Sequence, residues 1–103
     1  MKMKTDFKSI TLLTQTGVGG EIVHKLFEAG HRMVDLHHAR GSIVGGPLNK
    51  KGEPIEGEQE IITCLVESNQ ANDVFAMIYE WAGLDKPHGG FMYMQDLSGT
   101  TVQ

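Results

Sequence analysis

The stretch EIITCLVESNQANDVFAMIYEWAG, residues 60–83, changes within a few positions from a β-strand pattern to an α-helix pattern. Its first part is rich in β-branched and apolar residues, as strands are. Apolar residues then recur at helical spacing, at positions 71, 74, 75, 78 and 82. Ser68 and Asn69 are candidate N-cap residues, and Gly83 stands where a helix commonly ends. We therefore predict a strand over about 58–67, followed by a helix.

The same order occurs earlier in the chain. The pattern predicts a strand over about 7–15, a helix over about 20–29 and a strand over about 32–40, and a last strand covers about 91–97. Strand–helix–strand repeated twice is the split βαβ order. Because connections are short and right-handed, few other topologies remain. We therefore predict an α+β fold, a ferredoxin-like βαββαβ sandwich, whose first and third strands are central and parallel.

A long segment without periodicity joins the two halves. Residues 41–57, GSIVGGPLNKKGEPIEG, are rich in glycine and proline, and loops of this length are usually functional or disordered. A chain of 103 residues is expected to form one domain, residues 1–103.

Composition excludes several classes of function. A net charge of −4 argues against nonspecific binding to nucleic acid or to an anionic membrane. The predicted third strand has no aromatic residue, which disfavours an RNA-recognition domain. No apolar run approaches the roughly 20 residues of a membrane span, so no membrane insertion is expected. Cys64 is alone, which excludes an internal disulfide and favours a reducing compartment, so we expect a cytoplasmic protein.

Both faces of the predicted third strand are largely apolar. Residues 61, 63 and 65 point one way and residues 62, 64 and 66 the other, yet two helices cover only one face. An apolar second face requires a cover, and a second copy of the chain is the simplest one. The pattern therefore predicts an oligomer. The alternative cover is the C-terminal tail or the long loop.

Two segments combine a cation with glycines, as anion sites do. Arg40 precedes the glycines of HHARGSIVGG, residues 37–46, and Lys86 precedes Gly89 and Gly90 in DKPHGGFMYM, residues 85–94. Taken alone, each segment is better explained as a hinge or a turn than as an anion site. Neither matches the phosphate-loop pattern GxxxxGK[ST].

Metal binding and catalysis have less support in the sequence. His37 and His38 are adjacent in a strand and point to opposite faces, and no HxxxH or CxxC spacing occurs. A metal site shared between chains stays open. No nucleophile, base and acid can be identified together, and Cys64 has the setting of a packed thiol.

These features together resemble the P-II family of signalling proteins. The resemblance is carried by LFEAGHRMVDLHHARGS (26–42), EIITCLVESNQANDVFAMIYEWAG (60–83) and LDKPHGGFMYM (84–94). It implies a homotrimer that binds an adenine nucleotide (AMP, ADP or ATP) between subunits, and a T-loop, about 42–57, that docks on a membrane transporter or metabolic enzyme. The family is not enzymatic. The implied ligand contacts are Arg40, Gly41, Ser42, Thr63, Cys64, Lys86, Gly89 and Gly90, with Asp35 and Leu36 from the neighbouring chain.

The chain departs from the nitrogen regulatory members in its charges. Phe91 stands where they usually carry a lysine, the tail LSGTTVQ has no arginine, residues 41–58 have no tyrosine, and Asp35 replaces a small hydroxyl residue. With fewer cations, a mono- or diphosphate, bicarbonate or another small anion is favoured over a triphosphate unless magnesium adds charge. The alternatives are a metal-binding trimer of the copper-tolerance type and a small enzyme acting on an anionic substrate.

Overall fold

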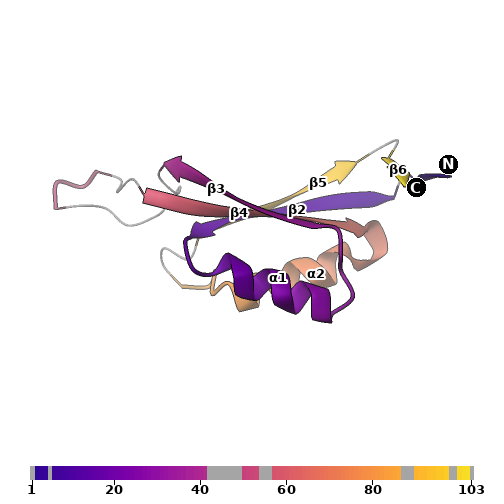
Figure 1. Cartoon of the computed structure of the whole chain (residues 1–103), viewed down its shortest axis with the longest axis horizontal. Helices are drawn as coiled ribbons and strands as arrows, with labels where there is room; N and C mark the ends of the chain where they lie inside the picture. Colours follow the sequence, from indigo (N-terminus) through magenta and orange to yellow (C-terminus); the bar gives the residue numbers. More distant parts are fainter. Residues whose placement is uncertain are drawn as a thin grey trace.

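Six strands and two helices make up the described parts of the chain in the computed structural model (Figure 1). The structure describes residues 2–4, 6–41, 50–53, 57–86, 90–97 and 100–102. In chain order the elements are β1 (Lys2–Lys4), β2 (Phe7–Gln15), α1 (Gly19–Glu28), β3 (Val34–Gly41), β4 (Gly57–Glu67), α2 (Ser68–Trp81), β5 (Phe91–Leu97) and β6 (Thr100–Val102). Most of the predicted T-loop lies outside the described residues.

Four strands form an antiparallel sheet in the order β3-β4-β2-β5. The predicted first and third strands, β2 and β4, are indeed central, but the prediction that they are parallel is wrong. They pair antiparallel, with Ile10 opposite Cys64. The βαβ connection makes β2 and β3 run in the same direction, and β4 reverses direction before it inserts between them. This is the predicted ferredoxin-like fold.

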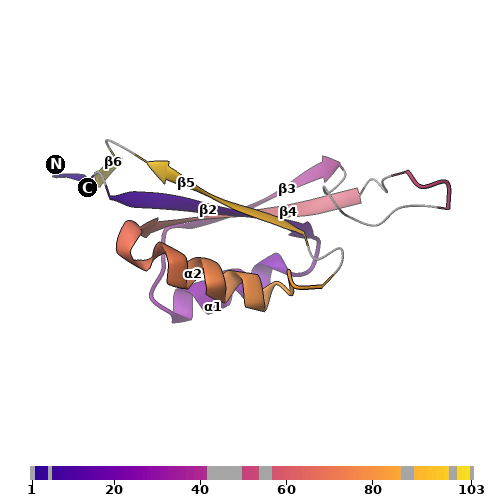
Figure 2. The same ribbon diagram turned by 180° about the vertical axis from the view of Figure 1, so that it is seen from behind.

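Both helices lie on one face of the sheet (Figures 1 and 2). The core lies between the two layers, because alternate residues of the central strands and one stripe of each helix face it. Its buried members are Ile10, Leu12, Ile22, Leu26, Ile62, Cys64, Val66, Ala71, Val74 and Ile78. The periodicity of residues 60–83 therefore predicted the packed face correctly.

The ends of the helices follow the glycine signals. Gly30 and Gly83 both have positive φ, +94° and +67°, which L side chains rarely adopt, and each follows a helix as expected. The start of α2 differs from the prediction. Its N-cap is Glu67, without a side-chain cap hydrogen bond, and Ser68 and Asn69 already belong to the helix.

Two elements were not predicted. The three-residue strands β1 and β6 pair antiparallel and form a separate two-stranded sheet. They lie at the end of the main sheet opposite residues 50–53 (Figure 1). Strands of three residues are too short to produce a visible alternation in the sequence.

The helical layer contains the single tryptophan of the chain. The Lys25 ammonium of α1 lies 5.6 Å from the ring centroid of Trp81 in α2, within the range of a cation–π contact. Lys25 also pairs with Glu21 one turn earlier, at 3.3 Å. Trp81 therefore marks the contact between the two helices.

Candidate functional site

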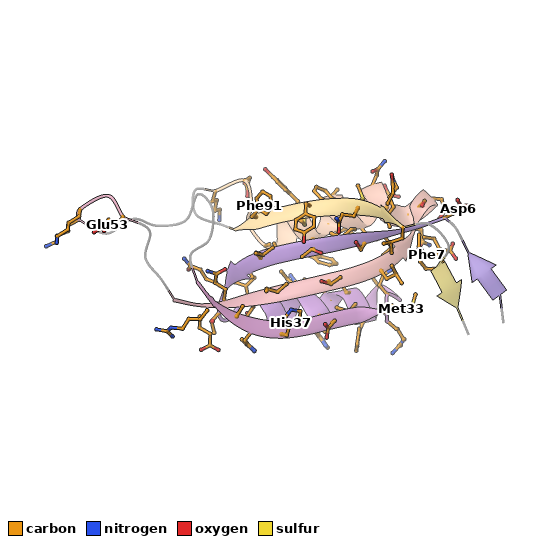
Figure 3. The ribbon with its side chains drawn as sticks, turned by 90° about the horizontal axis from the view of Figure 1, so that it is seen from above. Asp6, Phe7, Met33, His37, Glu53 and Phe91 are labelled. Carbon is orange, nitrogen blue, oxygen red and sulfur yellow. The ribbon has the colours of Figure 1, made fainter. Side chains whose placement is uncertain are left out.

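The face of the sheet away from the helices is covered by no described helix (Figure 3). Three rows of side chains cross it in register: His37, Ile61, Leu13 and Phe91; Asp35, Thr63, Thr11 and Tyr93; and Met33, Leu65, Ser9 and Gln95. We call these residues the uncovered face. Its most exposed apolar members are Phe91 and Met33, each 45% exposed. The Phe91 and Tyr93 rings lie 5.9 Å apart between centroids.

The first predicted anion segment lies at the loop end of the sheet. Arg40 and Gly41 close β3, where they pair with Glu58 and Gly57 at the start of β4. The Arg40 side chain is exposed. Ser42, the next predicted contact, lies outside the described residues. Arg40 is thus held on a regular strand with its side chain open to solvent.

The second predicted segment leads into the opposite edge of the sheet. Lys86 is exposed, and Gly90 directly precedes β5, whereas Gly89 lies outside the described residues. Gly90 has φ +126°, and a Cβ there would collide with the carbonyl oxygen of Leu13. Because β3 and β5 are opposite edges, Arg40 and Gly90 are separated by three strand spacings, roughly 14 Å. Arg40 and Gly90, which are described residues of the two segments, are therefore not neighbours within one chain.

The other predicted contacts fall on opposite faces of the sheet. Asp35 and Thr63 are paired neighbours on the uncovered face, and the Asp35 carboxylate lies 3.2 Å from His37 Nδ1. Leu36 and Cys64 point the other way and pack in the core. Their side chains meet the helical layer, so a ligand on the uncovered face does not touch them.

Burial governs the chemistry of Cys64. Its side chain is fully buried, and burial raises the pKa of the thiol to about 11. A thiol with so high a pKa is protonated at neutral pH and is a poor nucleophile. This agrees with the interpretation of Cys64 as a packed thiol.

Glu60 is the one buried carboxylate among the described residues. Its Oε1 accepts hydrogen bonds from the backbone N–H groups of Gly17 and Gly19, at 3.0 and 2.7 Å. Its Oε2 lies 3.2 Å from His38 Nε2. Burial alone raises the pKa of the Glu60 carboxyl, but the bonds from Gly19, Gly17 and His38 outweigh it, and the net pKa is lowered. Glu60 is therefore held as a carboxylate.

Sequence reasoning missed Glu60 as well as a second feature, an open depression of about 440 Å³ at the end of the sheet away from residues 50–53. The depression is lined by Phe7, Gly30, His31, Arg32, Met33, Leu65, Val66, Glu67 and Gln70. The signal available for it was the polar pair His31–Arg32 directly after the helix-ending Gly30. The Arg32 guanidinium lies over the Phe27 ring, 5.8 Å from its centroid.

The described residues bear on two alternatives, a metal site and a membrane-spanning helix. No group of three or more His, Cys, Asp or Glu side chains in these ranges is arranged to hold a metal ion. His88, one of the five histidines, lies outside them. Neither described helix has the length and hydropathy needed to cross a membrane.

Comparison with known proteins places the fold. The sequence matches no protein-family model and no curated protein. The structure is similar to Arabidopsis thaliana PII bound to citrate, at TM-score 0.68 and 16% identity, over 92% of this chain and 80% of that one. It is also similar to the B. subtilis GlnK–ATP complex, at TM-score 0.71 and 15% identity, over 94% and 86%. The chain therefore has a P-II-like fold, as its sequence predicted.

Proposed function

We propose that this chain, which has a P-II-like fold, is a regulatory protein without catalytic activity. In this proposal it assembles as a homotrimer in the cytoplasm, binds an adenine nucleotide or a small anion in clefts between subunits, and controls a protein partner through the T-loop, about 42–57. The single observation that carries the proposal is the agreement of fold with PII and GlnK over 92% and 94% of this chain.

The uncovered face supports the assembly. It exposes Phe91, Met33 and Tyr93 beside the half-buried Ile61 and Leu65. Apolar groups gathered on one face of a small domain are stabilised when another surface excludes water from them. A further copy of the chain can provide that surface, because every copy is present wherever the protein is present.

The separation of the two cationic segments supports a cleft between copies. Arg40 lies in one edge strand, and Gly90, which follows Lys86 in the second segment, directly precedes the other edge strand. We propose that each segment faces a neighbouring copy, with the backbone at Gly41 and at Gly90 beside the ligand. We propose that a ligand lies where an edge of one copy meets the next copy.

The ligand class follows from charge. The two similar structures hold citrate and ATP, which are both multiply charged anions. In this chain Arg40 and Lys86 are the exposed cations at the predicted positions. Two cations balance a mono- or diphosphate better than a triphosphate. AMP and ADP are therefore the preferred candidates, ATP requires magnesium, and bicarbonate is the smallest alternative.

Calorimetry tests the ligand. AMP, ADP, ATP with and without magnesium, cyclic AMP and bicarbonate are titrated into the wild-type protein. Arg40→Ala and Lys86→Ala are each expected to weaken a phosphate ligand by about 1–3 kcal/mol, the range for a charged hydrogen bond. Lys25→Ala, which removes one cation from the helical layer, is the matched control. Absence of binding at millimolar concentration, or equal weakening by all three variants, would falsify the proposed site.

Light scattering tests the assembly independently. A trimer gives three times the mass of one chain at micromolar concentration. A monomer at that concentration contradicts the homotrimer and with it every site that requires a neighbouring copy.

A further inference from the structure

A set of polar contacts outside the proposed ligand contacts ties the glycine turn after β2 to the base of the long loop. We call the set the loop-base latch, and it comprises Thr16, Gly17, Gly19, His38, Glu58 and Glu60. Thr16 Oγ1 donates to the carbonyl oxygen of Glu58 at 2.9 Å. Glu60 accepts from the turn with one oxygen and contacts His38 with the other. β4 is therefore bonded directly to the turn, and β3 is linked to the turn through Glu60.

Glu60 is the residue on which most contacts of the loop-base latch converge. The residue is 6% exposed, and it lies opposite Thr14 of β2 and opposite His38 of β3. Its carboxylate thus links β3 and β4 to the turn after β2 and to the start of α1. A helix N-terminus with free N–H groups favours a negative charge, and here the chain supplies that charge itself.

Gly19 shows that the fit is specific. A Cβ at Gly19 would lie 2.9 Å from Leu36 Cδ1 and 3.0 Å from Glu60 Oε1, so both side chains would have to shift to admit it. Glycine lets the turn approach both the Leu36 side chain and the carboxylate without such a shift. The glycine-rich turn TGVGG, residues 16–20, is therefore occupied by an internal anion rather than open to an external phosphate.

We infer that Glu60 is a positioning residue that holds the base of the long loop against the first turn of α1, so that Arg40 is presented in one orientation. Arg40 lies two residues after His38 on β3 and pairs with Glu58, which Thr16 holds. Movement of the turn is transmitted to both ends of the loop base through these bonds. The functional part of this inference, the presentation of Arg40 to an anion, rests on the proposed function, but the latch itself does not.

Limited proteolysis tests the latch in the full chain. Trypsin cleaves after Arg40, which lies within β3, and after Lys50 and Lys51, which are exposed. Mass spectrometry gives the ratio of cleavage at Arg40 to cleavage at Lys50–Lys51, so the exposed lysines act as an internal reference. Because a charged hydrogen bond is lost, Glu60→Ala is expected to raise the ratio on the order of tenfold.

Val74→Ala is the matched control for simple loss of stability. Val74 is 1% exposed in α2 and is not part of the latch, so this variant weakens the core without changing the loop base. It is expected to leave the ratio unchanged. If Val74→Ala raises the ratio as much as Glu60→Ala does, Glu60 is only a core residue and the inference is wrong.

Glu60→Gln keeps the test valid if the alanine variant does not fold. Its side-chain oxygen still accepts from Gly17 and Gly19 but carries no charge, so the ratio should rise less than in Glu60→Ala. Hydrogen exchange at the Gly19 amide should also accelerate relative to the Ile22 amide one turn later. Unchanged exchange and an unchanged ratio in Glu60→Gln would overturn the inference.

Ligand affinity separates this inference from the proposed function. If wild-type protein binds AMP or ADP, Glu60→Gln should weaken binding in the same direction as Arg40→Ala, although Glu60 faces the helical layer. Undiminished affinity in Glu60→Gln would overturn the positioning role. If the wild-type protein binds neither nucleotide, the proposed nucleotide site fails, and the cleavage ratio still decides whether the latch exists.

Discussion

The two faces of the sheet contain similar apolar residues but bury them to different extents. On the helix-covered face Ile62 and Cys64 of β4 are 1% and 0% exposed. On the uncovered face their neighbours Ile61 and Leu65 are only half-buried, and Phe91 at the sheet edge is 45% exposed. The strand is the same, so the difference comes from what lies above each face. Apolar content alone therefore does not identify the core; the second layer does.

Burial on the two faces also contributes to two different equilibria, folding and association. Burial on the covered face belongs to the folding of one chain and does not depend on protein concentration. Burial on the uncovered face requires a partner, so in the proposed trimer its contribution follows mass action.

Truncation of the covered face should be the most damaging change. Ile62→Ala leaves a cavity among Leu12, Leu36 and the helices, and such substitutions cost about 2–5 kcal/mol in the free energy of unfolding. Urea denaturation measures the loss. Ile61→Ala, on the adjacent position of the other face, should cost less when both variants are measured at low protein concentration. Equal losses would show that the two faces are equally packed within one chain.

A charge on the uncovered face should act on assembly instead. Ile61→Asp places an unpaired carboxylate at the surface proposed to bury against another copy, and an uncompensated buried charge is strongly unfavourable. Light scattering should give the mass of one chain, while circular dichroism keeps its helical signal. Asn72→Asp, on the exposed side of α2, adds the same charge and should leave the mass unchanged. A trimer that persists in Ile61→Asp would place the interface elsewhere.

Glu60, the one buried carboxylate among the described residues, faces the helical layer, and its contribution to stability should depend on pH. The pKa of the Glu60 carboxyl is lower in the folded chain than in the unfolded one, so the unfolded state takes up the proton first as the pH falls. The stability from Glu60 is complete above the unfolded value, about 4.3, and is lost as the pH falls through the lower folded pKa. Urea unfolding from pH 7 to pH 3 should therefore show a smaller decline for Glu60→Gln than for the wild type. Parallel curves would mean that Glu60 is not stabilised as a carboxylate.

The smallest effect concerns Cys64, whose thiol should react only slowly until the chain unfolds. With its pKa raised to about 11, the thiol has little thiolate at pH 8. Its reaction with an aromatic disulfide reagent should be slower than in guanidinium-unfolded protein by at least the order of a hundredfold. Rapid reaction in the folded state would show that the helical layer opens readily over β4.

Periodicity predicted the positions of the helices and strands better than the relative directions of the strands. The strand over 7–15 and the last strand over 91–97 agree with β2 and β5, because both combine alternation with clear glycine or turn boundaries. The direction of β4 relative to β2 was wrong, since a side-chain pattern identifies faces but carries no information on strand direction. The short β1 and β6 left no pattern to read.

The candidate site was predictable only where its residues are close in sequence. ARG at 39–41 and the turn before β5 were visible as cations beside glycines, and their contact with a ligand stays a prediction. The Glu60 contacts with Gly17 and Gly19 join residues more than 40 positions apart, so no local pattern reveals them. Gly90 stays a predicted ligand contact, and its backbone also lies close to the carbonyl oxygen of Leu13. A glycine pattern shows where a backbone comes close to something, and the fold decides what that is.

The single tryptophan provides an optical measure of this two-sided design. Trp81 lies in the helical layer beside Lys25, on the side of the sheet away from the proposed interface. Its emission should shift when the helices separate from the sheet and should stay constant when copies associate through the other face. In a Tyr79→Phe variant, where Tyr93 on the uncovered face is the one remaining tyrosine, tyrosine fluorescence anisotropy should instead respond to association. One dilution series that records both tryptophan emission and tyrosine anisotropy would therefore distinguish dissociation of the copies from unfolding of the chain without any label.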